Sequence, residues 1–155
     1  MGRNSAHMSN TAAGLRALPK SRRSQTVKRR FTAIEHHAAI MGGYPVKVVE
    51  KLAGNIGVNA EDLAKRIGIS RTTYKRYLVS KKTLNGLQSD ILSKYNSLFH
   101  QATEVFDGDV TAAREWLQSS QVGLGGGIPL EFARTTVGFR EVEKLLTRID
   151  HGVYA

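Results

Sequence analysis

The sequence predicts an all-α protein with a helix-turn-helix in its first half, a small helical domain after it and a disordered basic arm in front. Apolar residues recur at the three- and four-residue spacing of helices from Phe31 to Ile149. Capping residues such as Asn59, Ser70 and Asp109 precede these segments, and glycines separate them. With 155 residues the chain can form one ordinary domain or two small ones.

The composition limits the classes of protein to consider. The chain has no cysteine, which excludes disulfides and cysteine-based zinc sites and favours a reducing cytoplasm. No apolar run approaches the roughly 18 residues of a membrane span, and the N-terminus has no apolar segment typical of a signal peptide. We therefore expect a soluble, cytoplasmic protein without membrane contact.

The net charge of +10 is unevenly distributed along the chain. Residues 1–30 hold eight basic and no acidic side chains, and residues 46–94 hold ten basic and four acidic ones, a net +6. Residues 95–155 hold five basic and eight acidic side chains, a net −3, and residues 31–45 contribute −1. The front of the chain therefore suits a polyanion such as DNA, which would repel the acidic C-terminal third.

The N-terminal segment shows no apolar periodicity. Met1–His7 is typical of an expression-vector remnant, and Ser9–Arg30 is rich in serine, alanine and basic residues, which predicts a disordered arm. Two interpretations of the arm stay open: a solvated tail, or a segment that contacts DNA phosphates without sequence preference.

Two helices are expected before the helix-turn-helix. The first is Phe31–Met41, which ends at a pair of glycines, and Pro45 opens the next element. The second is Val46–Asn55, which is closed by Gly54 or Gly57.

The helix-turn-helix is predicted from the residues around Gly68. Asn59 caps a first helix that contains Ala64, which is small enough for a second helix to cross there. Gly68 takes the turn conformation, Ile69 buries its side chain between the helices, and Ser70 caps the second helix. The alternative is an ordinary helical hairpin with a solvated basic face.

The second helix of this motif runs from Arg71 to Leu78 and carries the candidate DNA-binding residues. Tyr74 and Leu78, four residues apart, are expected to pack inward. The opposite face presents side chains that can contact base edges and phosphates. The candidate DNA-binding residues are Ser70, Arg71, Thr72, Thr73, Lys75 and Arg76.

A long helix follows the polar connector Ser80–Gly86 and ends at Phe106–Gly108. Its predicted apolar stripe suits either a core or a dimer seam. The stripe consists of Leu87, Ile91, Tyr95, Leu98, Ala102 and Val105. Asp109 then caps a shorter helix that carries Trp116 and Leu117.

The segment Ser119–Ile128 contains four glycines, and phosphate-binding loops are also rich in glycine. It lacks the Lys-Ser or Lys-Thr pair of a P-loop, and no strand precedes it as a dinucleotide-binding fingerprint requires. We therefore expect tight turns that bring backbone close to a neighbouring helix. Pro129 opens a short helix, and Thr135 or Thr136 caps the last one.

The last helix carries one apolar face and leads into an apolar tail. The face consists of Val137, Val142, Leu145, Leu146 and Ile149. The tail ends with Val153, Tyr154 and Ala155. It can close the core of its own domain or of a homodimer, or it can enter a pocket of a partner protein.

The sequence contains no recognisable catalytic or metal-binding set. His36 and His37 are adjacent, so on a helix they point in different directions and cannot share a metal ion. There is also no nucleophile with a base beside it and no carboxylate pair on a plausible cleft. We therefore expect no enzymatic activity and no cofactor.

An ordered series of residues carries a family resemblance. The series is Ala113, Trp116-Leu117, Leu124-Gly125-Gly126, Pro129-Leu130, Thr136, Gly138, Val142, Leu145-Leu146, Arg148-Ile149 and Gly152-Val153-Tyr154-Ala155, with Ser89-Asp90 and the helix-turn-helix upstream. It resembles the toxin-binding domain and the Xre-type helix-turn-helix of the MbcA/ParS/Xre antitoxin family. The resemblance covers residues 42–155.

The resemblance implies an antitoxin of a bacterial type II toxin–antitoxin system. Its partner would be a RES-domain toxin, which consumes NAD or transfers ADP-ribose, and the antitoxin's C-terminal domain would cover the toxin's NAD pocket. Its helix-turn-helix would repress the shared operon by binding operator DNA, as a homodimer or in a larger complex with the toxin. The expected toxin-binding residues are Arg148, Asp150, His151, Gly152, Val153, Tyr154 and Ala155.

The tail supplies the groups expected to enter the toxin pocket, namely the ring of Tyr154 and the carboxylate of Ala155. The corresponding domains are the remnant and arm at 1–30, the DNA-binding domain at 31–86 and the toxin-binding and oligomerisation domain at 87–155. The alternative is a stand-alone transcription regulator whose C-terminal domain only dimerises or binds a small effector.

Overall fold

The computed structural model describes residues 32–153, in which the only β-pairing is a pair of isolated bridges. All regular secondary structure in this range is helical, which confirms the all-α prediction. The predicted vector remnant and basic arm, Phe31, and the last two residues, Tyr154 and Ala155, lie outside the described residues.

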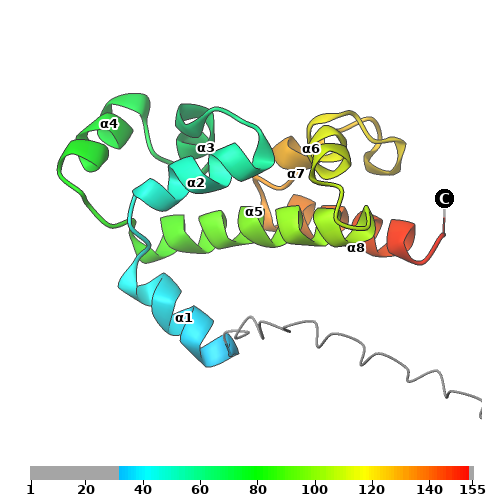
Figure 1. Ribbon diagram of the computed structural model, residues 1–155, viewed down its shortest axis with the longest axis horizontal. Coiled ribbons are helices and arrows are strands. Elements are labelled where there is room, and N and C mark those ends of the chain that lie inside the picture. The colour runs from blue at the N-terminus through cyan, green and yellow to red at the C-terminus, as the bar shows by residue number, and fades with distance from the viewer. Residues whose placement is uncertain (1–31, 154–155) are drawn as a thin grey trace, which may run out of the picture. The chain divides into compact units, whose positions relative to one another are not determined.

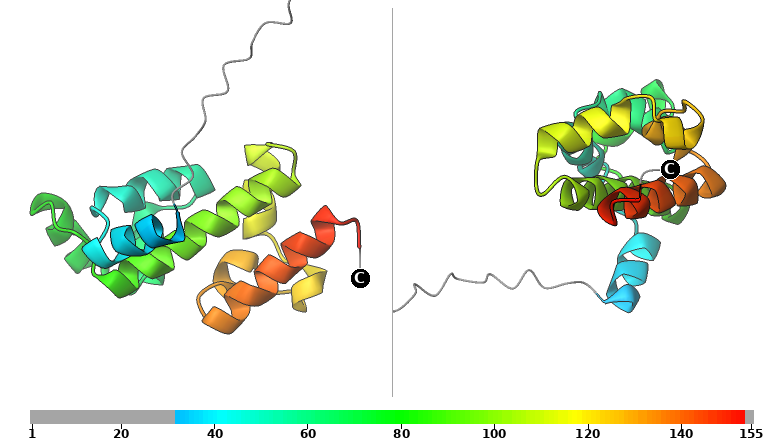
Figure 2. Two further views of the ribbon diagram at one scale, coloured as in Figure 1. Left: turned by 90° about the horizontal axis from the view of Figure 1, so that it is seen from below. Right: turned by 90° about the vertical axis from the view of Figure 1, so that its right-hand side faces the viewer.

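The described residues form eight α-helices and one 3₁₀ helix, η1 (Figure 1). In chain order they are α1 (Ala33–Gly42), α2 (Lys47–Ile56), α3 (Ala60–Arg66), α4 (Arg71–Val79), α5 (Gly86–Val105), α6 (Val110–Gln118), η1 (Val122–Leu124), α7 (Pro129–Phe132) and α8 (Thr136–Asp150). The 20-residue α5 packs against α1, α2, α6 and α8. In Figure 2, α8 runs alongside α5. The domain boundary expected at residues 86 and 87 stays a prediction, since α5 begins there and contacts helices on both sides of it.

The helices begin where the capping residues predict. Thr32 opens α1 through a capping box with Glu35, because each side chain bonds the other residue's backbone N–H. Asn59 and Asp109 accept backbone N–H bonds at the starts of α3 and α6. Of the two candidates for the last helix, Thr135 is the cap. The cap signal in the sequence is therefore accurate to the residue at α3 and α6, whereas the first helix, predicted to begin at Phe31, begins at Ala33.

The buried face of α5 matches the predicted stripe in part. Leu87 lies in the first turn and is 70% exposed. The buried residues of α5 are Ser89, Leu92, Tyr95, Leu98, Phe99 and Ala102. Tyr95, Leu98 and Ala102 are buried as predicted, and Ile91 and Val105 are half-buried against the core. Ser89 also turns inward, and its hydroxyl accepts the Tyr44 N–H at 3.0 Å. A polar residue therefore occupies a core position that an apolar pattern cannot mark.

The apolar face of α8 is confirmed except at its first turn. Val142, Leu145 and Leu146 are buried, and Ile149 packs against the core. Val137 is 73% exposed and lies in the first turn of the helix, two residues after the Thr135 cap. The core begins one turn later than the pattern predicts.

The glycine-rich loop brings backbone close to its neighbours, as predicted. A Cβ on Gly123 would lie 2.6 Å from the Cδ1 atom of Leu145 in α8, and one on Gly127 would overlap the Phe132 ring. Gly138 in α8 is as restricted, since a Cβ there would overlap the carbonyl oxygen of Phe132. These three glycines allow η1, α7 and α8 to pack together.

Alanine substitutions at two helical glycines should have opposite effects on stability. Gly138→Ala should lower the free energy of unfolding by about 1–3 kcal/mol, because the new methyl group meets backbone. Gly54→Ala should raise it by about 0.5–1 kcal/mol, since Gly54 lies inside α2 with open space around it. Urea unfolding followed by circular dichroism measures both. A Gly138→Ala chain as stable as the Gly54→Ala chain would show that the α7–α8 approach is not tight.

Candidate nucleic-acid and protein interfaces

The helix-turn-helix consists of α3, α4 and the turn between them. Gly68 has φ 82°, a left-handed conformation that suits glycine. The side chains of Ala64 and Ile69 are buried, and the Ile69 N–H donates to the Ala64 carbonyl at 2.9 Å. Ser70 then caps α4 through the Thr73 N–H. The turn predicted from the sequence is therefore present with each residue in its expected role.

The candidate DNA-binding residues divide into an outward face and a cap. Arg71, Thr72, Lys75 and Arg76 are exposed on α4. Thr73 is half-buried, and its hydroxyl accepts a hydrogen bond from the Ser70 hydroxyl at 2.9 Å. The structure therefore places Thr73 beside the cap at the start of the helix.

Glu61 in α3 pairs with two of the exposed basic residues. Its carboxylate lies 2.6 Å from Arg71 Nε and 3.6 Å from Lys75 Nζ. The sequence gives no signal for this pairing, because an acid in the first turn of a helix is explained by the helix dipole alone. The pairing holds Arg71 and Lys75 on the outer side of the motif.

Tyr74 anchors α4 from its inner side. Its side chain is buried, as predicted, and its hydroxyl has no hydrogen-bond partner among the described residues. Burial, with Glu50 and Glu61 nearby, raises the pKa of Tyr74 to about 12, so the phenol stays neutral. Leu78 is only half-buried, although it packs against the same core.

The outer side of α8 forms a shallow groove of about 620 Å³ with mixed charges. Its lining residues are Arg140, Glu141, Glu143, Lys144, Thr147 and Arg148. Arg148 is half-buried, and its Nε has no hydrogen-bond partner among the described residues. A guanidinium N–H that is buried without an acceptor costs free energy.

The described part of the tail turns back on the end of α8. Gly152 has φ 68°, and the Val153 N–H donates to the Arg148 carbonyl at 2.9 Å. Asp150, His151 and Gly152 are exposed, and Val153 is 56% exposed. The Val153 side chain therefore does not close the core of this chain.

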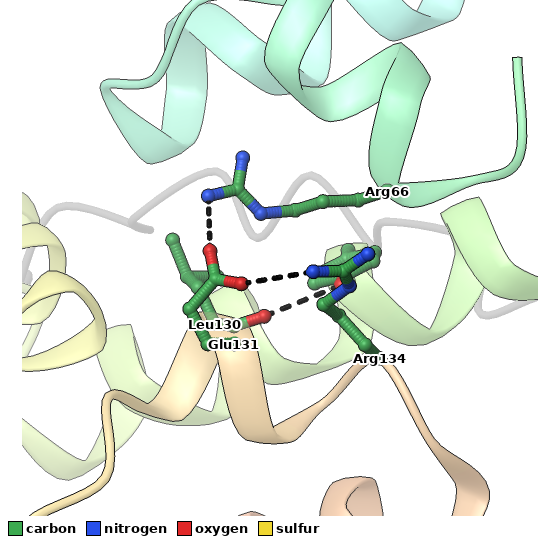
Figure 3. Close-up of polar contacts among 5 residues, drawn as sticks. Arg66, Leu130, Glu131 and Arg134 are labelled. Atoms are coloured by element: carbon green, nitrogen blue, oxygen red, sulfur yellow. Dashed lines mark hydrogen bonds and ion pairs between the residues drawn. The ribbon is translucent and has the colours of Figure 1, made fainter. Parts of the chain in front are cut away.

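A charged cluster connects the helix-turn-helix to α7 (Figure 3). Arg66 at the end of α3 reaches Glu131 at 2.5 Å, and Arg134 binds the other carboxylate oxygen at 3.4 Å. The hydrogen bond from Arg66 is the main cause that lowers the pKa of Glu131. Beside this cluster, the Tyr95 hydroxyl of α5 donates to the Leu130 carbonyl at 3.3 Å.

The side chains of α6 satisfy the open carbonyl end of α2. Arg114 donates to the carbonyls of Asn55 at 2.7 Å and Gly54 at 2.9 Å, and Gln118 donates to Ile56 at 3.0 Å. The last carbonyls of a helix lack partners within it, so these bonds act as a cap supplied from elsewhere in the chain. The side chains of α6 thereby attach to α2, and Glu131 of α7 attaches to α3.

The fold defines the class: a helix-turn-helix protein with a second helical domain toward the C-terminus. Two domain families match the chain. The antitoxin Xre-like helix-turn-helix domain matches residues 35–96, and the antitoxin Xre/MbcA/ParS C-terminal toxin-binding domain matches residues 101–152. The chain therefore belongs to the Xre/MbcA/ParS antitoxin family, with a helix-turn-helix domain followed by a toxin-binding domain.

Two curated relatives are similar over most of the chain. "Antitoxin Xre" of Photorhabdus laumondii subsp. laumondii is 26% identical over 117 residues, which cover 76% of this chain and 79% of the relative. "Antitoxin Xre" of Yersinia enterocolitica serotype O:8 is 23% identical over the same shares of both chains. The antitoxin assignment predicted from the residue series is confirmed.

Two further properties concern the described residues only. Between residues 32 and 153, no helix is both long and apolar enough to cross a membrane. In the same range, no group of three or more histidine, aspartate or glutamate side chains gathers where a metal ion could bind.

Replacing Glu131 by glutamine should destabilise the protein by about 0.5–1 kcal/mol at neutral pH, a modest value because the carboxylate is 42% exposed. Because Arg66 lowers the pKa of Glu131, the ion pair stabilises the fold at pH values above 4.5, the ordinary pKa of glutamate. This stabilisation is lost as the pH falls through the pKa that Glu131 has in the folded protein. Denaturant unfolding at pH 7 and pH 3 measures the difference. Glu141→Gln, which removes a pair with Lys144 three residues along the same helix, is the control and should have a smaller effect. Equal effects of the two substitutions, or a difference that persists at pH 3, would contradict the role of Arg66.

Proposed function

We propose that this antitoxin neutralises a RES-domain toxin in the cytoplasm by covering its NAD pocket, and that it represses its own operon by binding operator DNA. The exposed tail at the end of α8 supports the first activity. The basic outer face of α4 supports the second. The two surfaces lie on different elements of the chain, so one molecule can use both.

The toxin-binding surface consists of the end of α8 and the tail. The turn at Gly152 fixes the backbone through Val153, which leaves an apolar side chain in solvent. Exposed apolar residues rimmed by polar side chains are typical of protein interfaces. Arg148, Asp150 and His151 supply a polar rim. Tyr154 and Ala155 follow Val153 directly and would enter the pocket with it.

Deleting residues 150–155 should release toxin activity, because the segment that covers the pocket is lost. The fold should survive, since the buried residues of α8 end at Leu146. NAD consumption by the purified toxin with each antitoxin variant is the readout, with circular dichroism as the folding control.

A pair of point variants tests the same surface without shortening the chain. Val153→Asp should weaken toxin inhibition at least tenfold, because a charge replaces an apolar contact. Val79→Asp is the matched control, since Val79 is 87% exposed at the far end of the helix-turn-helix. Full inhibition by both the truncated chain and the Val153→Asp chain would show that the tail does not enter the pocket.

Operator binding would use the outward face of α4. Arg71 and Arg76 can donate paired hydrogen bonds to guanine edges, while Lys75 and Thr72 can reach bases or phosphates. Glu61 keeps Arg71 and Lys75 extended on this face before DNA arrives. Ser70 and Thr73 would contribute mainly by holding the start of α4 in place.

Replacing Arg71 or Arg76 by alanine should cost about 1–3 kcal/mol of operator binding for each arginine that contacts a base, and should relax sequence preference. Fluorescence anisotropy with the chain's own promoter and a scrambled duplex measures both effects. The control chain carries Arg140→Ala and Lys144→Ala on α8 and has the same net charge. Unchanged discrimination in the Arg71→Ala, Arg76→Ala double variant would exclude α4 as the reading helix.

Two copies of the chain would suit an operator with two-fold symmetry. An exposed apolar stripe supports this part of the proposal. Ile34 and Met41, seven residues apart on α1, are 81% and 66% exposed, and Leu87 of α5 is 70% exposed. None of the residues of α1 is buried. Sedimentation of the free protein measures the number of copies.

A further inference from the structure

Three lysines from two distant segments meet beside the helix-turn-helix. The chain that leaves α4 returns to the start of α2, where the Val46 N–H donates to the Lys82 carbonyl at 3.1 Å. An isolated bridge joins Pro45 and Thr83 in the same place. Lys47 is thereby brought next to Lys81 and Lys82, more than 30 residues later in the sequence.

The lysines line one small groove without any acidic residue. Its lining residues are Pro45, Val46, Lys47, Lys81 and Lys82. All three lysines are exposed, and none takes part in an ion pair among the described residues. By contrast, Lys94 and Lys144 both pair with acidic neighbours on their own helices. The groove therefore presents uncompensated positive charge.

The backbone holds Lys81 in a conformation that lysine seldom takes. Lys81 follows the end of α4 with φ 50°, where glycine is the usual residue. The Lys82 N–H donates to the Tyr77 carbonyl at 3.0 Å, and the Lys82 ammonium lies 5.5 Å from the centre of the Tyr77 ring. Glycine or asparagine would suit this turn better, so the stability of the turn does not explain the lysine.

We propose that Lys47, Lys81 and Lys82 bind phosphates of the DNA backbone at the edge of the DNA major groove that α4 enters. This inference rests on the proposed DNA binding. The nine residues of α4 span about 13 Å, close to the major-groove width of about 12 Å. Arg71 begins this span, and the three-lysine cluster follows its end. Ammonium groups act on phosphates as point charges, so the cluster adds affinity without reading sequence.

The test removes the three charges without disturbing the turn. Lys47→Gln, Lys82→Gln and Lys81→Asn are combined, since asparagine tolerates a positive φ. Binding to the promoter fragment and to a scrambled duplex of equal length is measured from 50 to 200 mM salt. Three lost phosphate contacts lower the salt slope by about 2.7, so over this range the unmodified chain should lose about 40-fold more affinity than the variant. Both duplexes should be affected by the same factor.

A control with the same change in net charge separates local contact from overall charge. Lys51→Gln, Lys94→Gln and Lys144→Gln remove three lysines outside α3, α4 and the groove, and this chain should keep the unmodified salt slope. Equal slopes in the two triple variants would overturn the proposal, as would a loss confined to the promoter duplex or no binding of either duplex by the unmodified chain. Unchanged melting temperatures confirm that both variants fold.

The result also distinguishes this inference from the proposed repression. The unmodified chain could bind both duplexes equally while only the variant at Lys47, Lys81 and Lys82 shows the lower salt slope. In that case the phosphate contacts are supported and operator recognition is not. If the unmodified chain prefers the promoter but the variant at Lys47, Lys81 and Lys82 has the same salt slope as the control variant, operator recognition is supported and the phosphate-binding cluster is not.

Discussion

Both matched domains depend on the burial of α5. It contacts α1 and α2 of the first matched domain and α6 and α8 of the second. Tyr95 is central to this arrangement, because its ring is buried and its hydroxyl reaches the Leu130 carbonyl of α7. Burial raises the pKa of Tyr95 to about 12, so its hydrogen stays available for this bond over the whole physiological range. Because α5 packs against both domains, a rotation that improved its packing against one domain would disturb its packing against the other.

The local chemistry of the chain made much of the fold predictable. Asn59, Gly68 and Ser70 define the turn of the helix-turn-helix, since each acts through its own backbone or that of a residue close in sequence. The same holds for Asp109 and the α6 cap. The antitoxin family could also be predicted, because it rests on an ordered series of residues.

Contacts between distant residues could not be predicted in this way. Ser89 faces the core because Tyr44, 45 residues earlier, needs an acceptor for its N–H. Glu61 pairs with Arg71 across the turn, and Glu131 pairs with Arg66 over 65 residues, and neither pairing has a periodic signal. The three-lysine cluster likewise forms only when the segment after α4 packs against the start of α2. The expected roles of Tyr154 and Ala155 depend on a surface of another molecule.

The bonds from α6 to α2 and from α7 to α3 restrict how this protein could assemble on DNA. Arg114 and Gln118 hold the end of α2, and Glu131 holds the end of α3, so the start of the C-terminal domain is attached at two points. A copy seated on one half-site would therefore present its α8 in one direction only. Two copies on neighbouring half-sites would hold their toxins at a separation set by the number of base pairs between them. The spacing of the half-sites in the operator would then determine the distance between the two bound toxins.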